Sequence, residues 1–159
     1  MKKLFKRMAT IFLAVMLIVT VIQPIQAASP KYTGTYTKVW AAPSYATNVT
    51  LKPQYSVIVN KVTRKKVTLQ LEKLGLNGSP FYATAPVTAT RKGNTVNFKW
   101  KDTWGNSGNG TLKLYNGYVK LKVNETKSSK WNRSSLSTWG KYMKISKKNN
   151  NTKLDNIDF

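Results

Sequence analysis

The chain has no cysteine and no histidine, and only 5 of its 159 residues are acidic. The absence of cysteine excludes disulfide bonds, a lipid-modified cysteine and thiolate metal ligands. Without histidine or cysteine there is no Ser-His or Cys-His pair, and no serine is followed three residues later by lysine, so a Ser-x-x-Lys nucleophile is also absent. The composition therefore excludes the common forms of nucleophilic catalysis.

One catalytic route that remains is a pair of carboxylates, because glycosidases place two carboxyl groups on either side of the bond they cleave. Asp102 and Glu125 are predicted to lie at the same end of the molecule. Their cationic surroundings favour the ionised form over the protonated acid that such a reaction needs. We therefore expect no catalytic residues, no metal ion and no cofactor.

Basic residues are abundant, with 27 Lys and Arg against the 5 acids. The first 27 residues have the pattern of a secretory signal peptide: four cations, an apolar run of about a dozen residues at 11–22 and small residues at Ala27 and Ala28. That run is short for a membrane span, which needs about 20 residues. Removing Lys2, Lys3, Lys6 and Arg7 leaves 23 basic and 5 acidic residues, a net charge of +18. We expect a signal peptide at 1–27, one β domain at 28–147 and a flexible polar tail at 148–159.

Apolar residues between these ends recur with a period of two, which predicts half-buried antiparallel strands. Eight strands with no intervening helix are predicted, at 32–40, 55–62, 65–74, 81–90, 95–101, 111–115, 118–123 and 141–146. The segment 81–90 contains Pro86 and is expected to be interrupted or to lie at a sheet edge. The predicted fold is all-β, an up-and-down barrel of about eight strands, with a two-sheet sandwich as the alternative.

The Asn116-Gly117 pair predicts a tight hairpin, since this dipeptide favours a type I′ turn with positive φ at both positions. A two-residue loop sets the register, so Leu114 is expected to face Val119 on the core side. On the outer face Lys113 is expected to face Lys120. Like charges in that position oppose folding, and an anionic ligand would relieve them.

Basic residues are also predicted to gather at the barrel end that carries the short links between strands. Together these positions form a candidate binding set for an anionic polymer. The alternative is a solvated face whose lysines keep strand edges from aggregating. The set comprises Lys61, Arg64, Lys65, Lys66, Arg91 and Lys92 at the turns, and Lys99, Lys113, Lys120 and Lys122 on the outer face.

The longer links, at 41–54, 75–80, 102–109 and 125–140, are expected to meet at the opposite end, together with all five tryptophans. Long loops on a rigid scaffold often carry binding residues. Trp40 and Trp100 suit a role in closing the barrel end. A flat ring among amides and hydroxyls suits a sugar or a hydrophobic ligand. The residues predicted for such a site at the mouth are Trp104, Asn106, Trp131, Arg133 and Trp139.

Two resemblances add to this interpretation. Gly34-Thr35-Tyr36 resembles the Gly-x-Trp opening strand of lipocalin-type (calycin) β-barrels, with tyrosine in place of tryptophan, and an eight-strand meander is similar to their architecture. The segment 102–110 followed by 132–136 is similar to small exported β-domains of Bacillus-like Gram-positive bacteria. The first resemblance implies a barrel and the second implies export.

We therefore expect a secreted or wall-associated cationic barrel, not an enzyme, that binds anionic cell-envelope or matrix polymers such as teichoic acid or acidic polysaccharide. A saccharide or hydrophobic ligand at the mouth is a further candidate. Export argues against intracellular nucleic acid as a partner. The alternative is an extracellular effector, either an antibacterial protein acting on anionic membranes or an inhibitor of a secreted hydrolase.

Overall fold

The computed structural model describes residues 31–130 and 136–147. The predicted signal peptide, Trp131, Arg133 and the predicted tail lie outside the described residues. All pairings between the strands are antiparallel. The strands are β1 (Gly34–Val39), β2 (Gln54–Val62), β3 (Lys66–Leu74), β4 (Phe81–Ala83), β5 (Val87–Lys92), β6 (Thr95–Lys101), β7 (Ser107–Leu114), β8 (Tyr118–Lys127) and β9 (Met143–Lys147), with a short 3-10 turn η1 (Leu76–Gly78).

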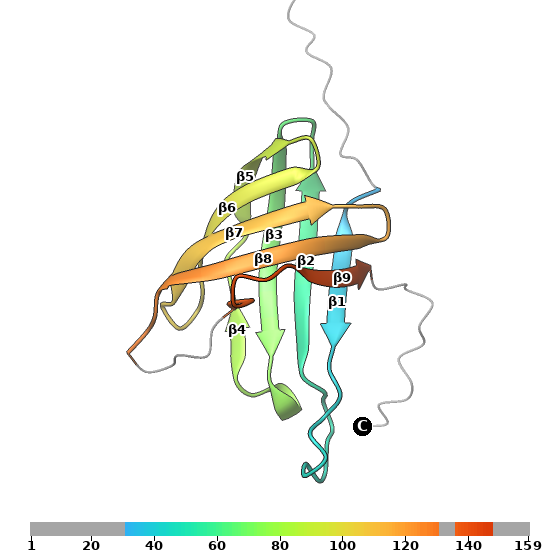
Figure 1. Cartoon of the computed structure of the whole chain (residues 1–159), viewed down its shortest axis with the longest axis vertical. Coiled ribbons are helices and arrows are strands. Elements are labelled where there is room, and N and C mark those ends of the chain that lie inside the picture. Colours follow the sequence, from blue (N-terminus) through green and yellow to red (C-terminus); the bar gives the residue numbers. More distant parts are fainter. Residues whose placement is uncertain (1–30, 131–135, 148–159) are drawn as a thin grey trace, which may run out of the picture.

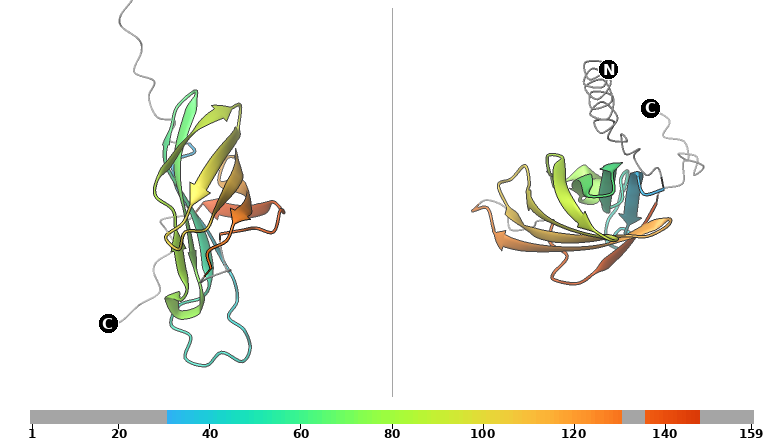
Figure 2. Two further views of the ribbon diagram at one scale, coloured as in Figure 1. Left: turned by 90° about the vertical axis from the view of Figure 1, so that its left-hand side faces the viewer. Right: turned by 90° about the horizontal axis from the view of Figure 1, so that it is seen from above.

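Eight of these strands form a closed antiparallel barrel in the order β1-β2-β3-β5-β6-β7-β8-β9. Pairing of β9 with β1 closes the ring, which confirms the predicted up-and-down barrel over the sandwich. In Figure 1, β6, β7 and β8 cross in front of β1, β2 and β3. Seen from above, the strands curve around a flattened interior (Figure 2).

The barrel interior is a packed hydrophobic core. Inward positions follow the predicted alternation, so that Val96, Phe98 and Trp100 of β6 are all buried. The largest fully buried side chains include Tyr36 and Tyr55, and the Tyr36 hydroxyl donates to the carbonyl oxygen of Tyr32 at 2.8 Å. Bulky side chains thus occupy the space that a wide ligand-binding barrel would leave open.

The predicted strand 81–90 is divided into β4 and β5, which run one after the other along the same edge of β3. The break lies at Ala85 and Pro86, which confirms the expected interruption. Proline has no N–H to donate to a ladder, so a strand tends to break or lie at an edge there. A single bridge from Thr84 to Asp102 ties this break to the end of β6.

The predicted long loop at 102–109 is wrong, because β7 begins at Ser107 and leaves only a tight turn after β6. Two inward positions of β7 are glycines, Gly108 and Gly110, so the alternation of apolar side chains is invisible there. The Phe98 ring covers Gly110, where an added Cβ would lie 2.2 Å from Phe98 Cζ. An aromatic ring from the neighbouring strand supplies the apolar surface that the glycine lacks.

The hairpin at Asn116-Gly117 has the predicted register, with Leu114 opposite Val119 and Lys113 opposite Lys120. The predicted type I′ turn is wrong. Gly117 has φ 79°, whereas Asn116 is not among the residues with positive φ. A single positive φ at the second central position is the pattern of a type II turn, which places its one unusual conformation on glycine.

Candidate functional site

Three lysines form a row across the outer face of β7, β8 and β9. Lys113 is directly opposite Lys120, and Lys120 is directly opposite Lys144. Opposed residues of antiparallel strands have Cα atoms roughly 4.5–5.5 Å apart, so three positive charges meet within the width of three strands. The first pair was predicted from the hairpin, whereas Lys144 was not predicted. Together with Lys122, which lies opposite Thr111, we call these residues the lysine face.

Tyrosine rings, rather than carboxylates, are the neighbours of these lysines. The Nζ atoms of Lys113 and Lys122 lie 4.9 and 5.4 Å from the ring centroid of Tyr142. The Nζ of Lys144 lies 4.6 Å from the centroid of Tyr118, whose ring stacks on Tyr115 at 4.6 Å and 6°. Cation–π contacts of this kind hold each ammonium group in place and leave its charge uncompensated.

The acidic residues of the described part of the chain have cross-strand neighbours outside the lysine face or lie at the end of a strand. Glu72 lies opposite Ser56 and Ala83, and Glu125 lies opposite Gly108. Asp102 is buried at the end of β6. None of the three is a cross-strand partner of the lysine face, so the repulsion between its opposed lysines is unrelieved by local pairing.

The predicted cluster at the short-link end is also assembled. The β2–β3 and β5–β6 turns lie together, because Arg91 N donates to the carbonyl oxygen of Lys65 at 2.8 Å. Most cations of this cluster are exposed, namely Lys61, Arg64, Lys65, Lys66 and Lys92.

Arg91 differs from the other members of this cluster because its guanidinium group is occupied within the fold. Its Nη1 donates to the carbonyl oxygen of Thr63 at 3.3 Å and its Nε to that of Gly93. The guanidinium carbon lies 5.4 Å from the ring centroid of Tyr32. Arg91 therefore joins two turns and covers this end of the barrel.

At the opposite end, Leu136 enters the barrel and is fully buried. The buried Tyr55 hydroxyl donates to its carbonyl oxygen at 2.9 Å. The segment continues beside β8, where Thr138 N donates to the carbonyl oxygen of Val123 and Val123 N donates to Thr138 Oγ1, each at 2.9 Å. The mouth that sequence analysis proposed for a ligand is thus filled in part by the chain itself.

Burial of Tyr55 predicts a loss of stability in alkali. Burial raises the pKa of its hydroxyl far above the ordinary value of 10.0. The unfolded chain releases this proton above pH about 10 while the folded chain keeps it, so the free energy of unfolding falls as the pH rises past that value. Tyr55→Phe should lower stability by about 1 kcal/mol at pH 7 through loss of the hydrogen bond. It should also make the alkaline decline shallower in urea unfolding followed from pH 7 to 11.

Tyr36 provides a second test of the same effect, because burial and then the charge of Tyr32 also raise its pKa. Its own phenylalanine variant should remove a separate part of the alkaline decline. An unchanged pH profile in Tyr55→Phe would contradict the role given to this hydroxyl.

The predicted mouth residues Trp104 and Asn106 belong to the turn between β6 and β7. Asn106 is fully buried, its Nδ2 donates to Asp102 Oδ2 at 2.9 Å, and its Oδ1 accepts from Ser129 N at 2.6 Å. Trp104 is 45% exposed, and its Nε1 donates to the carbonyl oxygen of Phe81 at 2.6 Å. The polar atoms of both side chains thus form hydrogen bonds within the fold. The exposed edge of the Trp104 ring is the part that a ligand could contact.

Trp139 differs from the other tryptophans in that it is 88% exposed. It has φ 55° and is followed by Gly140 with φ 72°, so the chain makes a sharp turn here. The segment before β9, orange-red in Figure 2, projects from the side of the barrel that carries β8. The residues on either side of Trp139 contact β8, because Thr138 N donates to the carbonyl oxygen of Val123 and Gly140 lies against Asn124.

The described residues contain no group of three or more His, Cys, Asp or Glu side chains that could hold a metal ion. The two carboxylates considered for catalysis accept hydrogen bonds from residues close to them in the chain. Asp102 Oδ1 accepts from Trp104 N and Asn106 N, each at 2.9 Å, and Glu125 accepts from Ser128 Oγ. Across 31–130 and 136–147, no helix is long and apolar enough to cross a membrane.

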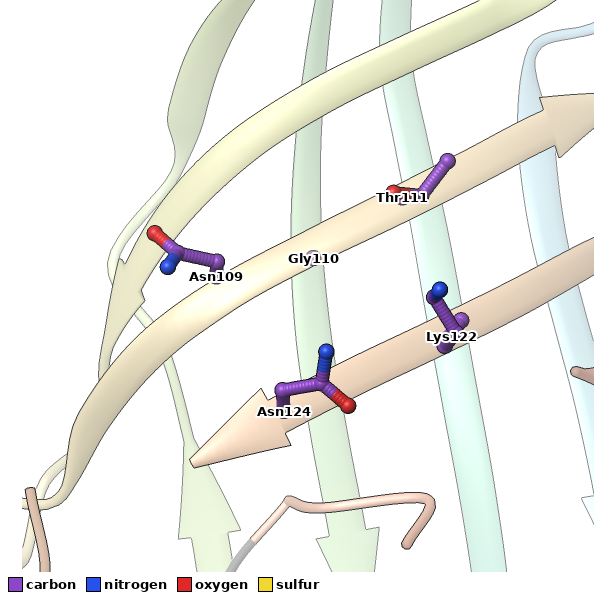
Figure 3. A pocket seen from close by; sticks show the side chains of 5 residues that line it. All are labelled: Asn109, Gly110, Thr111, Lys122 and Asn124. Carbon is purple, nitrogen blue, oxygen red and sulfur yellow. The ribbon is translucent and has the colours of Figure 1, made fainter. Parts of the chain in front are cut away.

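The outer face of β6, β7 and β8 also carries two adjoining shallow hollows, both with Gly110 at the floor. Figure 3 shows one of them, lined by Asn109, Thr111, Lys122 and Asn124. Asn97 and Lys99 extend the other toward β6. None of these three asparagines was predicted as a site residue, although alternation with buried residues places Asn97 and Asn124 on the outer face and the Asn116-Gly117 register places Asn109 opposite Asn124.

The fold and these surfaces define a class of protein: an eight-stranded up-and-down β-barrel with a packed interior and a basic outer face. Comparisons of the chain with protein families, with curated proteins and with solved structures found no significant match. The likeness to lipocalin-type barrels remains a resemblance in strand number and order.

Proposed function

We propose that this chain is an exported binding protein, without enzymatic activity, that attaches to anionic polymers of the cell envelope or extracellular matrix. The row of Lys113, Lys120 and Lys144 is the observation that carries the proposal. Placing like charges directly opposite one another costs stability, and an anionic polymer bound across the row would offset that cost. The exposed cations of the short-link end would extend the contact.

The mechanism is charge neutralisation with release of counterions. A polymer with closely spaced phosphates or carboxylates carries condensed cations, which are set free when lysines take their place. Binding of this kind weakens steeply as salt is added. Tyr142, Tyr118 and Tyr115 support the lysines of the row, so the ammonium groups are held in place before the polymer arrives.

Retention on purified Gram-positive cell walls tests the proposal. The protein should be retained at 50 mM salt and lose on the order of 10³-fold in affinity by 200 mM, as expected for about six or more neutralised charges. Walls stripped of their phosphate polymers should retain much less protein. The proposal would be overturned if the amount of protein retained did not depend on salt, or if it stayed the same after the polymers were removed.

A membrane-active effector is the second candidate, and the exposure of Trp139 favours it. Tryptophan and tyrosine gather at membrane interfaces, and lysines near an anionic surface each add about 1 kcal/mol. Dye leakage from anionic vesicles at micromolar protein, without retention on walls, would support this candidate in place of polymer binding. Vesicles of neutral lipid provide the control.

A further inference from the structure

Three asparagines lie in two neighbouring cross-strand rows on the outer face of β6, β7 and β8. Asn109 is directly opposite Lys99 on one side and Asn124 on the other, and Asn97 is opposite Thr111. Thr111 Oγ1 donates to Asn97 Oδ1 at 3.0 Å. With Thr111 among them, these polar residues line the two hollows above Gly110, one of which is drawn in Figure 3. We call Asn97, Asn109, Thr111 and Asn124 the amide face.

Asparagine is depleted in strands, so three on adjoining strands are not there to stabilise the sheet. All three are exposed. Within the described part of the chain, the side-chain amides of Asn109 and Asn124 form no hydrogen bond. Each amide offers two donors and an acceptor, which are free to meet a ligand that both donates and accepts.

A tryptophan and two lysines lie at the edges of the amide face. Gly140 packs against Asn124, since a Cβ added there would lie 3.6 Å from Asn124 Oδ1, and the neighbouring Trp139 is 88% exposed. Lys99 and Lys122 stand opposite Asn109 and Thr111. Lys122 also belongs to the lysine face, so the two surfaces are continuous.

We propose that the amide face binds hydroxyl-bearing units of the anionic polymer, which makes the ligand an anionic polysaccharide or polyol phosphate rather than any polyanion. The inference rests on the proposed function. Hydroxyl groups donate and accept as the amides require, the polymer's charges meet Lys99 and Lys122, and an exposed indole ring suits the apolar face of a sugar. A polyanion without hydroxyls would use the lysines alone.

Two polycarboxylates separate these contributions: polygalacturonate, whose units carry hydroxyls, and polyacrylate, which has none. On each polymer the variant is compared with the unchanged protein, so that the different charge spacing of the two polymers does not enter. The double variant Asn109→Ala with Asn124→Ala should bind polygalacturonate about tenfold more weakly, which corresponds to the loss of a few hydrogen bonds. It should bind polyacrylate within about twofold of the unchanged protein, because the lysines remain. Asn60→Ala, an exposed position on β2, is the control and should change neither affinity.

The outcomes are distinguishable from failure of the proposed function. If the unchanged protein binds neither polymer in a salt-dependent manner, the proposed function fails. The unchanged protein could instead bind both polymers. If the double variant then loses no affinity for polygalacturonate, or loses equal affinity for both polymers, the amide face has no role in recognising hydroxyl groups. Thermal unfolding of the double variant should match that of the unchanged protein, because both side chains are exposed.

Discussion

Simultaneous replacement of Lys113, Lys120 and Lys144 by glutamine is expected to weaken binding to an anionic wall polymer by about 100-fold at low salt. Each lysine near an anionic surface contributes about 1 kcal/mol, and about 3 kcal/mol corresponds to two orders of magnitude in affinity. The slope of log affinity against log salt should also become shallower by about 2, since each neutralised charge contributes roughly 0.7 on a single-stranded polyanion. Titration at several salt concentrations measures both quantities.

A second triple variant at Lys52, Lys127 and Lys130 removes the same charge from exposed positions outside the row and serves as the matched control. It should lose only a few-fold in affinity. Equal losses in the two triple variants would show that net charge alone drives binding and would contradict a specific role for the row.

The single variant Lys120→Glu separates binding from folding. Lys120 lies between Lys113 and Lys144, so a carboxylate there converts two repulsive cross-strand pairs into attractive ones. The free energy of unfolding should rise by about 1 kcal/mol at low salt, while affinity for the polymer falls. A variant that is more stable and binds less well excludes misfolding as the cause of the lost binding.

Asp102→Ala is expected to produce the largest loss of stability, about 3 kcal/mol or more. The buried carboxylate accepts hydrogen bonds from Trp104 N, Asn106 N and Asn106 Nδ2, each at 2.9 Å. Alanine would leave these donors without a partner, and hydrogen bonds to charged groups contribute roughly 1.5–3 kcal/mol each. Urea unfolding of the variant and the unchanged protein measures the difference.

Asp102→Asn is the conservative comparison. Its side-chain oxygen can still accept from Trp104 N and Asn106 N, whereas its amide nitrogen meets the donating Nδ2 of Asn106. The loss should therefore be about half of that seen with alanine. A change below about 1 kcal/mol in Asp102→Ala would contradict the structural role given to this carboxylate.

Polymer binding by the folded fraction should be unaltered in both Asp102 variants, because the β6–β7 turn is not part of the lysine face. A parallel loss of binding at temperatures where the variant is folded would show that this turn takes part in recognition. The same variants thus test whether the mouth contributes to the proposed function.

Much of the strand arrangement could be predicted because a half-buried strand shows its two faces in alternating residues. The prediction failed where the inner residues carry no side chain: Gly108 and Gly110 hid the first half of β7, and only the Phe98 ring restores an apolar surface there. The type of turn at Asn116-Gly117 also could not be read from the dipeptide, since more than one turn places positive φ on glycine.

Two of the three lysines in the row could be predicted in the same way. A two-residue loop leaves little freedom in register, so the opposition of Lys113 and Lys120 follows from the hairpin alone. Lys144 comes after the long connection from 128 to 142, which imposes no register on β9. Its place beside Lys120 depends on how β9 fits between β8 and β1 when the barrel closes.

The amino-acid order therefore specifies the charge excess, the lack of histidine and cysteine, the eight strands of the barrel and one hairpin, because these depend on composition and on neighbours within a few residues. Barrel closure specifies which outward residues meet. The junction of Lys120 with Lys144 and that of Lys99 with Asn109 exist because packing of the whole interior sets the register between strands. A basic sequence thereby becomes a protein with a defined lysine face and an adjoining amide face.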